Sequence, residues 1–418
     1  MSRVIGLGVE IAGLDAALGD LVLIEGRQGP VEGHVVGLSG ETVLVSPYGD
    51  LGGLCVGQPA LAPGHPPTVP VGEELLGRVL DGLGRPIDDG DRLDGLERAP
   101  LEQRAPHPLR RERIAVPMSL GVKAIDTAIP CGRGQRVGIF AGSGVGKSTL
   151  LSMIVRGVQA DRVVVGLVGE RGREVREFID SDLGPEGLAR SVVVVATGDE
   201  PALMRLSAAQ TATRIAEDFR DRGEHVLLVM DSITRFAMAQ REIGLAAGEL
   251  PASRGYPPSV LSALPRLLER AGASHTGSIT ALYTVLVEGD DLNDPVADTV
   301  RSILDGHIVL SRELANAGHF PSIDVLRSVS RVVDSVTSRA QQDLASTMRE
   351  HLAAYEEARD LIEVGAYVGG SSRRIDAAIA RRDDIIGFLR QSRDEIVPIA
   401  EAWRLLQTAL GGPEGSPS

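Results

Sequence analysis

The sequence contains few of the features that mark secreted or membrane proteins. Its two cysteines, Cys55 and Cys131, form no CxxC pair and have no metal-ligand spacing, which argues against a disulfide framework and indicates a reducing compartment. No apolar run approaches the roughly 20 residues that a transmembrane helix needs, and the first residues lack the form of a signal peptide. We therefore expect a soluble, cytoplasmic protein.

Positive charge is also scarce, and lysine almost absent. The chain carries 43 Lys and Arg against 57 Asp and Glu, a net charge of -14, which argues against non-specific binding to nucleic acid or to an anionic membrane. Lysine occurs only at Lys123 and Lys147. A compact ammonium fits between phosphates where a planar guanidinium does not. The lysine at position 147 therefore indicates a phosphate-binding role, and chance is the alternative explanation.

The most informative motif is the stretch from Arg136 to Leu150, RVGIFAGSGVGKSTL. An apolar run that suits a strand, a glycine-rich turn, Lys-Ser and a helical pattern follow one another as in a P-loop, although Ala141 stands where the strict pattern has glycine. Lys147 is expected to reach the β- and γ-phosphates, and the Ser148 hydroxyl to bind Mg²⁺. A glycine-rich turn in an unrelated α/β protein is the alternative. The predicted nucleotide-binding residues are Gly142, Ser143, Gly144, Val145, Gly146, Lys147, Ser148 and Thr149.

A second nucleotide-site signal follows in an apolar run that ends in a carboxylate. His225 to Asp231 reads HVLLVMD, the pattern of a buried strand whose terminal aspartate holds the Mg²⁺ shell. The pattern is weak alone and stronger downstream of a P-loop. An acidic, turn-rich stretch, residues 288–295, is either a solvated connection or an interaction loop.

Composition divides the chain into three regions. Residues 1–90 alternate short strand-like runs, such as Val4–Val9, with glycine turns and predict a small β-barrel. Residues 91–340 begin with a polar linker and then alternate strands with helices, which predicts a parallel sheet. Residues 341–418 predict a packed helical domain, with an apolar stripe from Leu344 to Leu361, further helices at 375–390 and 396–410, and a disordered tail from Gly411. The stretch 76–87 is expected to lead out of the barrel as a strand and turn.

Five motifs in order resemble the flagellar protein-export ATPases and the related type III secretion ATPases. They are AGSGVGKSTL, GERGREVREFI, LLVMDSITRFAMAQREIG, DDLNDPVADTVRSILDGHIVLSR and HFPSID…SVSR. Both families resemble the catalytic subunits of rotary ATP synthases. The resemblance implies a multidomain α/β fold: an N-terminal β-barrel, a central RecA-like P-loop domain with a mostly parallel sheet, and a C-terminal helical domain. It also implies Mg²⁺-dependent ATP hydrolysis that energises protein export, flagellar rather than injectisome.

The resemblance carries several roles onto this chain. It implies that Glu170 polarises the attacking water, which agrees with its place at the end of a central strand; a surface glutamate is the alternative. Arg171 matches the γ-phosphate contact, Arg235 an ion-pair former and Phe320 the aromatic that stacks on adenine. Arg331 matches the arginine finger that completes a neighbouring subunit's site.

The resemblance also implies partners. It predicts a homohexamer, since one chain carries both halves of the site, bound to export-gate membrane proteins, a stator-like regulator, a coiled-coil central stalk and substrate–chaperone complexes. The stalk is expected near Asp290 and Asp291. Membrane association is expected only through partners, at the cytoplasmic face of the export apparatus, and ATP and Mg²⁺ are the expected cofactors.

Two departures and three rival interpretations accompany this prediction. Gly370-Ser371-Ser372-Arg373 replaces the usual Gly-Ser-Asp-Pro, which questions the local turn and any adenine contact from it. The chain starts almost directly on the first strand, so a partner-binding extension is either trimmed or replaced by another mode of docking. The rivals are a catalytic subunit of a proton- or sodium-translocating rotary ATPase, a hexameric RNA translocase and a non-catalytic ring scaffold. The acidic balance argues against RNA.

Overall fold

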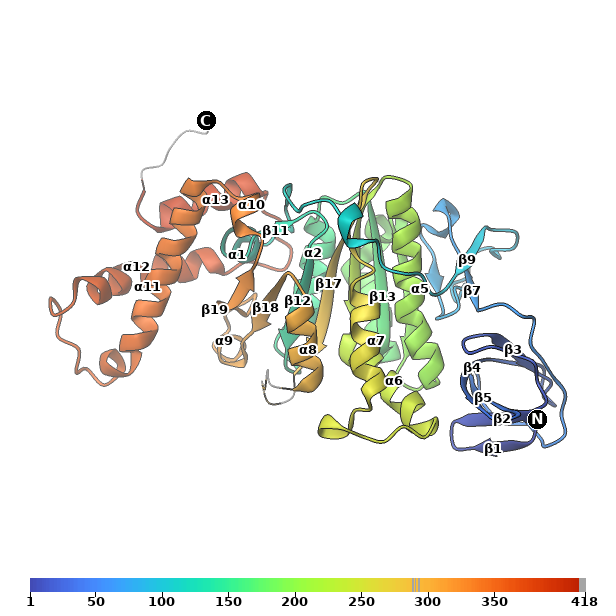
Figure 1. The fold of residues 1–418 in the computed structure, drawn as a ribbon. Coiled ribbons are helices and arrows are strands. Elements are labelled where there is room, and N and C mark those ends of the chain that lie inside the picture. Colours follow the sequence, from blue (N-terminus) through green and yellow to red (C-terminus); the bar gives the residue numbers. More distant parts are fainter. Residues whose placement is uncertain (288, 290, 292–293, 413–418) are drawn as a thin grey trace.

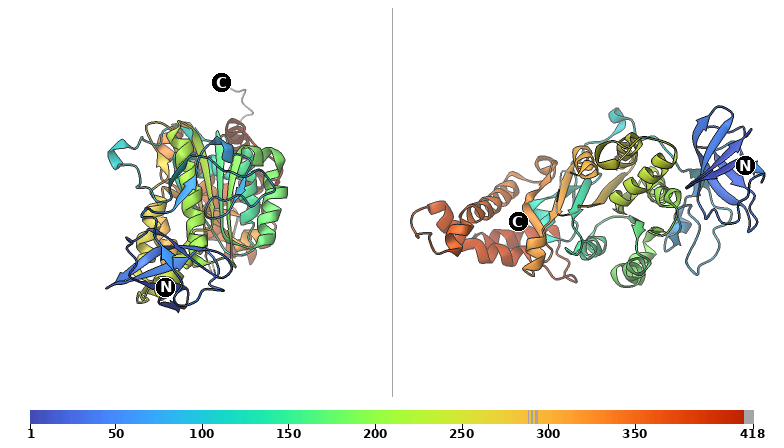
Figure 2. Two further views of the ribbon diagram at one scale, coloured as in Figure 1. Left: turned by 90° about the vertical axis from the view of Figure 1, so that its right-hand side faces the viewer. Right: turned by 90° about the horizontal axis from the view of Figure 1, so that it is seen from below.

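The computed structural model describes residues 1–287, 289, 291 and 294–412, arranged in three parts along one long axis (Figure 1). A strand-rich N-terminal part lies at one end, a sheet flanked by helices in the middle, and a bundle of helices at the other end. The view from below in Figure 2 shows the same elongated order. Within the described residues, no helix combines the length and apolar character needed to cross a membrane.

The N-terminal part is an antiparallel sheet that curls around its own apolar core, which confirms the predicted barrel (Figures 1 and 2). The expected single strand Val4–Val9 is wrong: it is a hairpin of two strands that turns at Gly6, whose φ of 53° suits glycine. The order in the sheet is β1-β2-β5-β4-β3-β6, and the strands are β1 (Arg3–Ile5), β2 (Gly8–Ala12), β3 (Leu21–Ile24), β4 (Val31–Ser39), β5 (Thr42–Pro47) and β6 (Ala60–Leu61).

The stretch after the barrel joins the central sheet instead of only leading away from the barrel. Strand β8 (Val79–Leu80) pairs in parallel with β14 (Ser191–Thr197). Asp88 accepts hydrogen bonds from the Arg78 guanidinium and, at 2.7 Å, from the Val79 N–H. The predicted linker contains β9 (Arg98–Pro100), which pairs with β7 (Thr68–Pro70).

The central sheet is mostly parallel, as predicted. Its order is β19-β18-β12-β17-β15-β13-β14-β8, with β19 antiparallel to β18 and the short β16 antiparallel to β17. Its other strands are β12 (Arg136–Ala141), β13 (Arg162–Glu170), β15 (His225–Asp231), β16 (Gly272–Ala273), β17 (Ser278–Leu286), β18 (Gly306–Leu310) and β19 (Ile323–Ser330). Strands β10 (Pro117–Met118) and β11 (Cys131–Gly132) form a separate two-stranded sheet.

Alternate side chains of the sheet enter two separate cores. On β13, Val164 and Val168 join the core beneath α5 to α8, whereas Val163 and Val165 join the core that includes α1 and α2. The central helices are α1 (Lys123–Ala128), α2 (Lys147–Gly157), α3 (Gly172–Glu177), α4 (Gly184–Ala189), α5 (Ala202–Asp221), α6 (Ile233–Ala246), α7 (Pro258–Leu268), α8 (Pro295–Ile303) and α9 (Arg312–Asn316), and η3 (Phe178–Leu183) is a π-helical segment between α3 and α4.

The C-terminal part is helical, as predicted. Its elements are α10 (Val333–Val336), α11 (Arg339–Glu363), α12 (Arg373–Leu389) and α13 (Ile399–Ala409). Trp403 on α13 and Met348 on α11 enter the same core as α2, so the bundle is anchored on the central domain. Leu361, expected in the packed stripe, is exposed. The predicted disordered tail falls mostly on 413–418, outside the described residues.

Candidate functional site

The glycine-rich loop after β12 leaves the start of α2 without a side-chain cap. The loop passes through Gly144 (φ 77°) and Gly146 (φ 92°), conformations that favour glycine, before α2 begins at Lys147. Ser148 and Thr149 in the first turn are exposed. Uncapped N–H groups at a helix N-terminus attract anions, so the loop has the backbone form that the sequence predicts for a phosphate site.

Two side chains from the β18–β19 connection brace this loop. The Ser322 hydroxyl donates a 2.6 Å hydrogen bond to the Val145 carbonyl. The Arg312 guanidinium donates a 3.1 Å hydrogen bond to the Ser143 carbonyl. Sequence reasoning missed both residues, because they lie 177 and 169 positions from their acceptors and no local pattern marks them.

The structure brings Lys147, Asp231 and Glu170 together at the carboxyl end of the sheet. The Lys147 ammonium pairs with Asp231, and it lies 3.6 Å from Glu170 Oε1. The Thr284 hydroxyl donates a 2.6 Å hydrogen bond to Asp231. These residues end or follow parallel strands of one sheet, whose carboxyl ends share an edge where ligands bind.

Burial and charge shift the protonation of this cluster. Burial, helped by the negative charge of Asp231, raises the pKa of Glu170 to about 7, and the Lys147 ammonium opposes the rise. Burial acts to lower the pKa of Lys147, but attraction to Asp231 and Glu170 outweighs it and the pKa is raised. Lys147 therefore stays cationic, and Glu170 is poised to exchange a proton near neutral pH.

Arg171 and Arg235, the two arginines predicted near this cluster, do not take part in its ion pairs. The Arg171 side chain is 83% exposed and pairs with Glu174 at 3.3 Å, so the structure does not draw it into the buried cluster. Arg235 packs against Gly169, where an added Cβ would lie 2.8 Å from the arginine Cβ. The ion pair expected for Arg235 is absent among the described residues; its Nη1 contacts the sulfur of Met238 at 3.6 Å.

Phe320 lies beside the P-loop, where an adenine-stacking residue is needed. Its ring is partly exposed, and Cε1 lies 3.3 Å from the position that a Cβ on Gly146 would take. Its carbonyl accepts a 3.0 Å hydrogen bond from the Gln391 N–H. Gln391 belongs to the helical domain, and no sequence signal marked it.

The altered Gly370-Ser371-Ser372-Arg373 turn is intact in the structure and lies far from the P-loop. Ser372 caps α12 by accepting a 3.5 Å hydrogen bond from the Ile375 N–H, and Asp376 accepts from the Gly370 N–H. The turn joins α11 to α12 at the outer end of the bundle (Figure 1). Gln391 therefore lies closer to Phe320 in this fold than the turn does.

Arg331 lies at the opposite end of the sheet from its own P-loop. It follows β19, whose last residue Ser330 faces Gly306 at the start of β18, and its N–H donates to the Asp305 carbonyl. Asp305 in turn pairs with Arg136 at the start of β12. Since β12 has six residues, about 20 Å of strand separates Arg331 from the P-loop.

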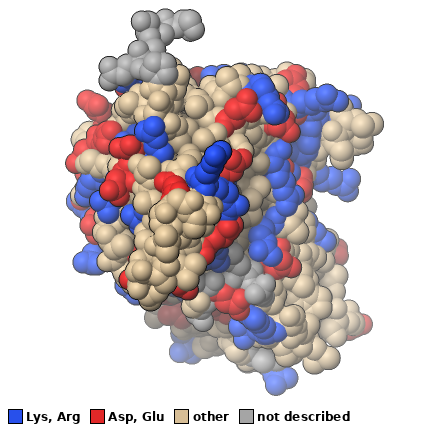
Figure 3. All heavy atoms as spheres, turned by 90° about the vertical axis from the view of Figure 1, so that its left-hand side faces the viewer, with Lys and Arg blue, Asp and Glu red and all other residues tan. Residues whose placement is uncertain are grey.

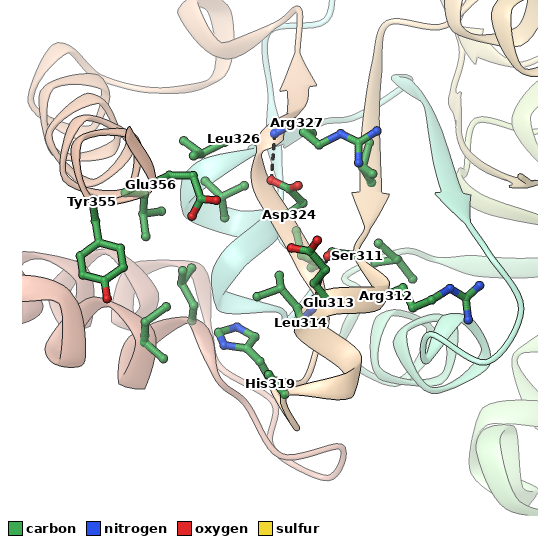
Figure 4. A pocket seen from close by; sticks show the side chains of 18 of the residues that line it. Ser311, Arg312, Glu313, Leu314, His319, Asp324, Leu326, Arg327, Tyr355 and Glu356 are labelled. Atoms are coloured by element: carbon green, nitrogen blue, oxygen red, sulfur yellow. Dashed lines mark hydrogen bonds between the residues drawn. The ribbon is translucent and has the colours of Figure 1, made fainter. Parts of the chain in front are cut away.

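A groove of about 740 Å³ separates the central domain from the helical bundle. Figure 4 shows Glu313, Leu314 and His319 approaching it from the α9 region, and Tyr355 and Glu356 from α11. Burial lowers the pKa of His319, so this histidine is neutral at physiological pH. Sequence reasoning missed the groove, because its walls come from segments far apart in the chain.

Carboxylates near the phosphate loop do not form a ready-made metal cage. Across residues 1–287, 289, 291 and 294–412, no group of three or more His, Cys, Asp and Glu side chains is placed to hold a metal ion. The donors beside the loop are the Asp231 carboxylate and the Ser148 hydroxyl. Mg²⁺ commonly uses one or two protein oxygens together with phosphate oxygens, so this donor set fits a metal that binds with nucleotide.

Fold and site together define a P-loop ATPase built on a RecA-like sheet. Residues 121–330 match the family model "ATP synthase alpha/beta family, nucleotide-binding domain", and residues 337–408 match "T3SS EscN ATPase C-terminal domain". The chain belongs to the ATP synthase alpha/beta family, among its flagellum-specific and type III secretion ATPases.

Individual relatives cover nearly the whole chain. The flagellum-specific ATP synthase of Bacillus subtilis is 52% identical, over 99% of this chain and 95% of the relative. A type 3 secretion system ATPase of Xanthomonas euvesicatoria is 50% identical, over 97% and 92%. The solved structure of the assembled ATPase EscN from enteropathogenic E. coli superimposes with a TM-score of 0.94 at 44% identity, covering 98% of this chain and 99% of that chain.

Proposed function

We propose that this chain hydrolyses Mg²⁺-bound ATP in a site shared by two copies in a homohexameric ring, and that hydrolysis energises protein export through a flagellar apparatus. The observation that carries the shared site is the separation of Arg331 from its own P-loop by the length of β12. We also propose the domain boundaries that the sequence predicts: a β-barrel at 1–90, a RecA-like ATPase domain at 91–340 and a helical domain at 341–418.

The first half of the site binds the triphosphate and the attacking water. Residues 142–149 hold the phosphates with backbone N–H groups, and the Lys147 ammonium neutralises the β- and γ-oxygens. Glu170, whose pKa of about 7 lets it accept a proton at neutral pH, orients and polarises water for in-line attack. Phe320 stacks on the adenine. Arg171 is free enough in its exposed position to turn toward the γ-phosphate.

The Asp231 carboxylate and Ser148 hydroxyl would hold Mg²⁺. The metal supplies positive charge against the phosphate oxygens when it is bound. In this structure the Lys147 ammonium pairs with Asp231, so a metal held by Asp231 would share that carboxylate with the lysine. That arrangement supports a metal that enters with nucleotide.

The second half of the site comes from the next copy. Arg331 is exposed, and its guanidinium makes a 3.4 Å hydrogen bond to the Arg301 carbonyl, so it is available to another surface. A head-to-tail contact that closes into a ring places each finger in the neighbouring P-loop, where it neutralises charge that develops on the γ-phosphate.

The relatives support the wider assignment. The assembled form of EscN was solved alone, and also in complex with its central stalk EscO; the latter structure matches with a TM-score of 0.91 and 43% identity. We propose a coiled-coil stalk in the pore, contacts to export-gate membrane proteins, a stator-like regulator and substrate–chaperone complexes, and a cytoplasmic location at the export apparatus. Asp290, one of the two aspartates expected at the stalk, lies outside the described residues. Asp291 pairs with Arg254 at 3.2 Å.

Genetic replacement tests the export assignment. The gene for this chain is expressed in Bacillus subtilis lacking its flagellum-specific ATP synthase, and secreted flagellar protein and swimming are measured. The wild-type chain is expected to restore both, whereas Lys147→Ala at equal expression should restore neither. Absence of rescue by a chain that still hydrolyses ATP in those cells would count against a flagellar role.

The injectisome is the second candidate, because type 3 secretion ATPases are about as similar as flagellar relatives. The same gene is therefore expressed in Xanthomonas euvesicatoria lacking its secretion ATPase. Rescue of effector secretion there, without rescue in the flagellar strain, assigns the chain to an injectisome.

A further inference from the structure

One strand connects the two nucleotide sites that each chain serves. Phe320 precedes β19 and lies beside the chain's own P-loop, whereas Arg331 follows β19 at the other end of the sheet. The five residues of β18 that pair with the two ends of β19, Gly306–Leu310, span about 16 Å. The segment 320–331 therefore carries one group to the chain's own nucleotide and another to its neighbour's.

Hydrogen bonds fix β19 along its length. The buried Ser328 hydroxyl donates to the Asp324 carbonyl at 2.6 Å and accepts from the Val309 N–H at 2.9 Å, which bridges the register irregularity between β18 and β19. The Ser330 hydroxyl donates to the Pro130 carbonyl at 2.7 Å. These bonds tie β19 to β18 and to Pro130 at separate points along its length.

The helical domain holds the middle of this strand, from Val325 to Ser328, through Arg349 of α11. One guanidinium nitrogen donates to the Val325 carbonyl at 2.5 Å, and the other donates to Ser328 at 3.0 Å and to Ala128 at 2.9 Å. β19 is an edge strand, so its Val325 and Ser328 carbonyls bond to the guanidinium where a further strand would otherwise pair, and the Ala128 carbonyl of α1 shares the same guanidinium. The planar fork suits several acceptors in fixed directions.

The same domain holds the Phe320 end through Gln391, just beyond α12. Its backbone N–H donates to the Phe320 carbonyl at 3.0 Å. Its buried carboxamide accepts from the Lys123 N–H and donates to the Gly121 and Glu395 carbonyls, each at 2.8 Å. The carboxamide thus anchors Gln391 to the central domain at Gly121 and Lys123, and the backbone N–H of the anchored residue holds the Phe320 carbonyl.

We propose that Arg349 and Gln391 are positioning residues through which the helical domain sets the two sites separately. Arg349 aims the Arg331 finger at the neighbour's nucleotide, and Gln391 sets Phe320 against the chain's own nucleotide. The proposal rests on the shared site proposed above. A partner that displaces α11 then changes turnover in the adjacent copy, whereas one that displaces the end of α12 changes nucleotide affinity in the same copy.

Mixing experiments with two tester chains separate these roles. Lys147→Ala keeps a finger but has a defective P-loop, and Arg331→Ala keeps a P-loop but has no finger. The measurements are kcat and KM for ATP in rings of each variant alone and in rings mixed with each tester. The two testers mixed with each other must hydrolyse ATP; if they do not, the shared site itself is wrong and fails independently of the positioning residues.

Arg349→Met is expected to lower kcat about 10- to 100-fold, because a misplacement of about 1 Å near reacting groups has effects of that order, with little change in KM. Lys147→Ala should rescue it by supplying intact fingers, whereas Arg331→Ala should not. Gln391→Ala is expected to raise KM several-fold with a smaller change in kcat. Arg331→Ala, which supplies an intact nucleotide pocket, should rescue it, and Lys147→Ala should not.

The control is Arg374→Met, which removes an exposed pair with Glu357 between α11 and α12 and should leave kcat, KM and both mixing patterns unchanged. Rescue of Arg349→Met by both testers or by neither overturns the proposal, as does a reversed pattern for Gln391→Ala. If Arg349→Met fails to bind nucleotide, Arg349→Lys tests the same role, because lysine keeps the positive charge but has fewer directed donors. A wild-type kcat for Arg349→Lys also overturns the proposal.

Discussion

The charged groups at the two ends of the central sheet differ in burial and in pairing. At the carboxyl end, Lys147 is buried between Asp231 and Glu170, and the cluster is complete within one chain. At the other end, Arg331 is exposed, with a 3.4 Å contact to a backbone carbonyl. A buried, paired cluster keeps its geometry unaided, whereas an exposed guanidinium is screened by water and gains its full effect only when another surface excludes that water.

This difference indicates which end of the sheet other copies and partners can influence more readily. The carboxyl end is preorganised, so binding of nucleotide needs little from other copies. In the shared site that we propose, the Arg331 end depends on assembly and on the position of β19, which the helical domain contacts through Arg349. Under the positioning roles proposed above, partners that act on α11 affect the finger, whereas partners that act on the end of α12 affect Phe320.

Removing the finger should have the largest effect. Arg331→Ala is expected to lower kcat roughly 10³- to 10⁵-fold, as arginine fingers do, while nucleotide binding persists. Steady-state hydrolysis and fluorescent-nucleotide binding measure the two quantities. Mixing with Lys147→Ala should restore part of the activity through hybrid interfaces. If no activity returns under conditions in which rings form, Arg331 of one copy does not complete the P-loop site of its neighbour.

Neutralising the buried base should have the next largest effect. Glu170→Gln is expected to lower kcat roughly 10²- to 10⁴-fold and to keep ATP affinity, since the amide retains size but cannot accept a proton. A matched control is Glu177→Gln, which changes an exposed glutamate at the end of α3. Turnover near the wild-type rate in Glu170→Gln would remove Glu170 from its role and leave the carboxyl end without a base.

The pH profile should report the same carboxylate. With a pKa raised by burial to about 7, Glu170 is protonated and inactive as a base below that pH and ionised above it. kcat/KM should therefore rise about tenfold per pH unit up to about pH 7 and then level off.

Glu174→Gln sharpens the test of this pH profile. Glu174 raises the pKa of Glu170 through a hydrogen bond and its charge, so the variant should shift the rise to lower pH. A profile that does not respond to Glu170→Gln would assign the titration to another group.

Loss of the aromatic beside the loop should have the smallest effect. Phe320→Ala is expected to weaken ATP binding by roughly 5- to 150-fold, the range that follows from about 1–3 kcal/mol for base stacking. Phe320→Tyr keeps the ring and should bind ATP almost as wild type does. Equal affinity of the alanine variant, measured by calorimetry, would reject stacking at this position.

Several parts of the fold followed from local pattern. The strand at 225–231 is a continuous apolar run, as a buried parallel strand requires, and the helices expected at 375–390 and 396–410 are α12 and α13. The sequence does not predict the hairpin within 4–9, because Gly6 is a single glycine among residues that favour strands. In the structure this glycine is enough to turn the chain. Strand β8 was placed with the barrel because two residues carry no signal of which sheet they join.

The sequence alone determined the phosphate loop, the carboxylate at the end of β15 and the three-part organisation, because each depends on residues adjacent in the chain. Only the tertiary structure decided that Lys147 lies between Asp231 and Glu170, that Arg331 lies a strand length away from them, and that Arg349 and Gln391 contact the segment joining Phe320 to Arg331. These contacts bridge residues 21 to 84 positions apart, so the packing of the sheet and the helical domain sets them, and no local pattern encodes them.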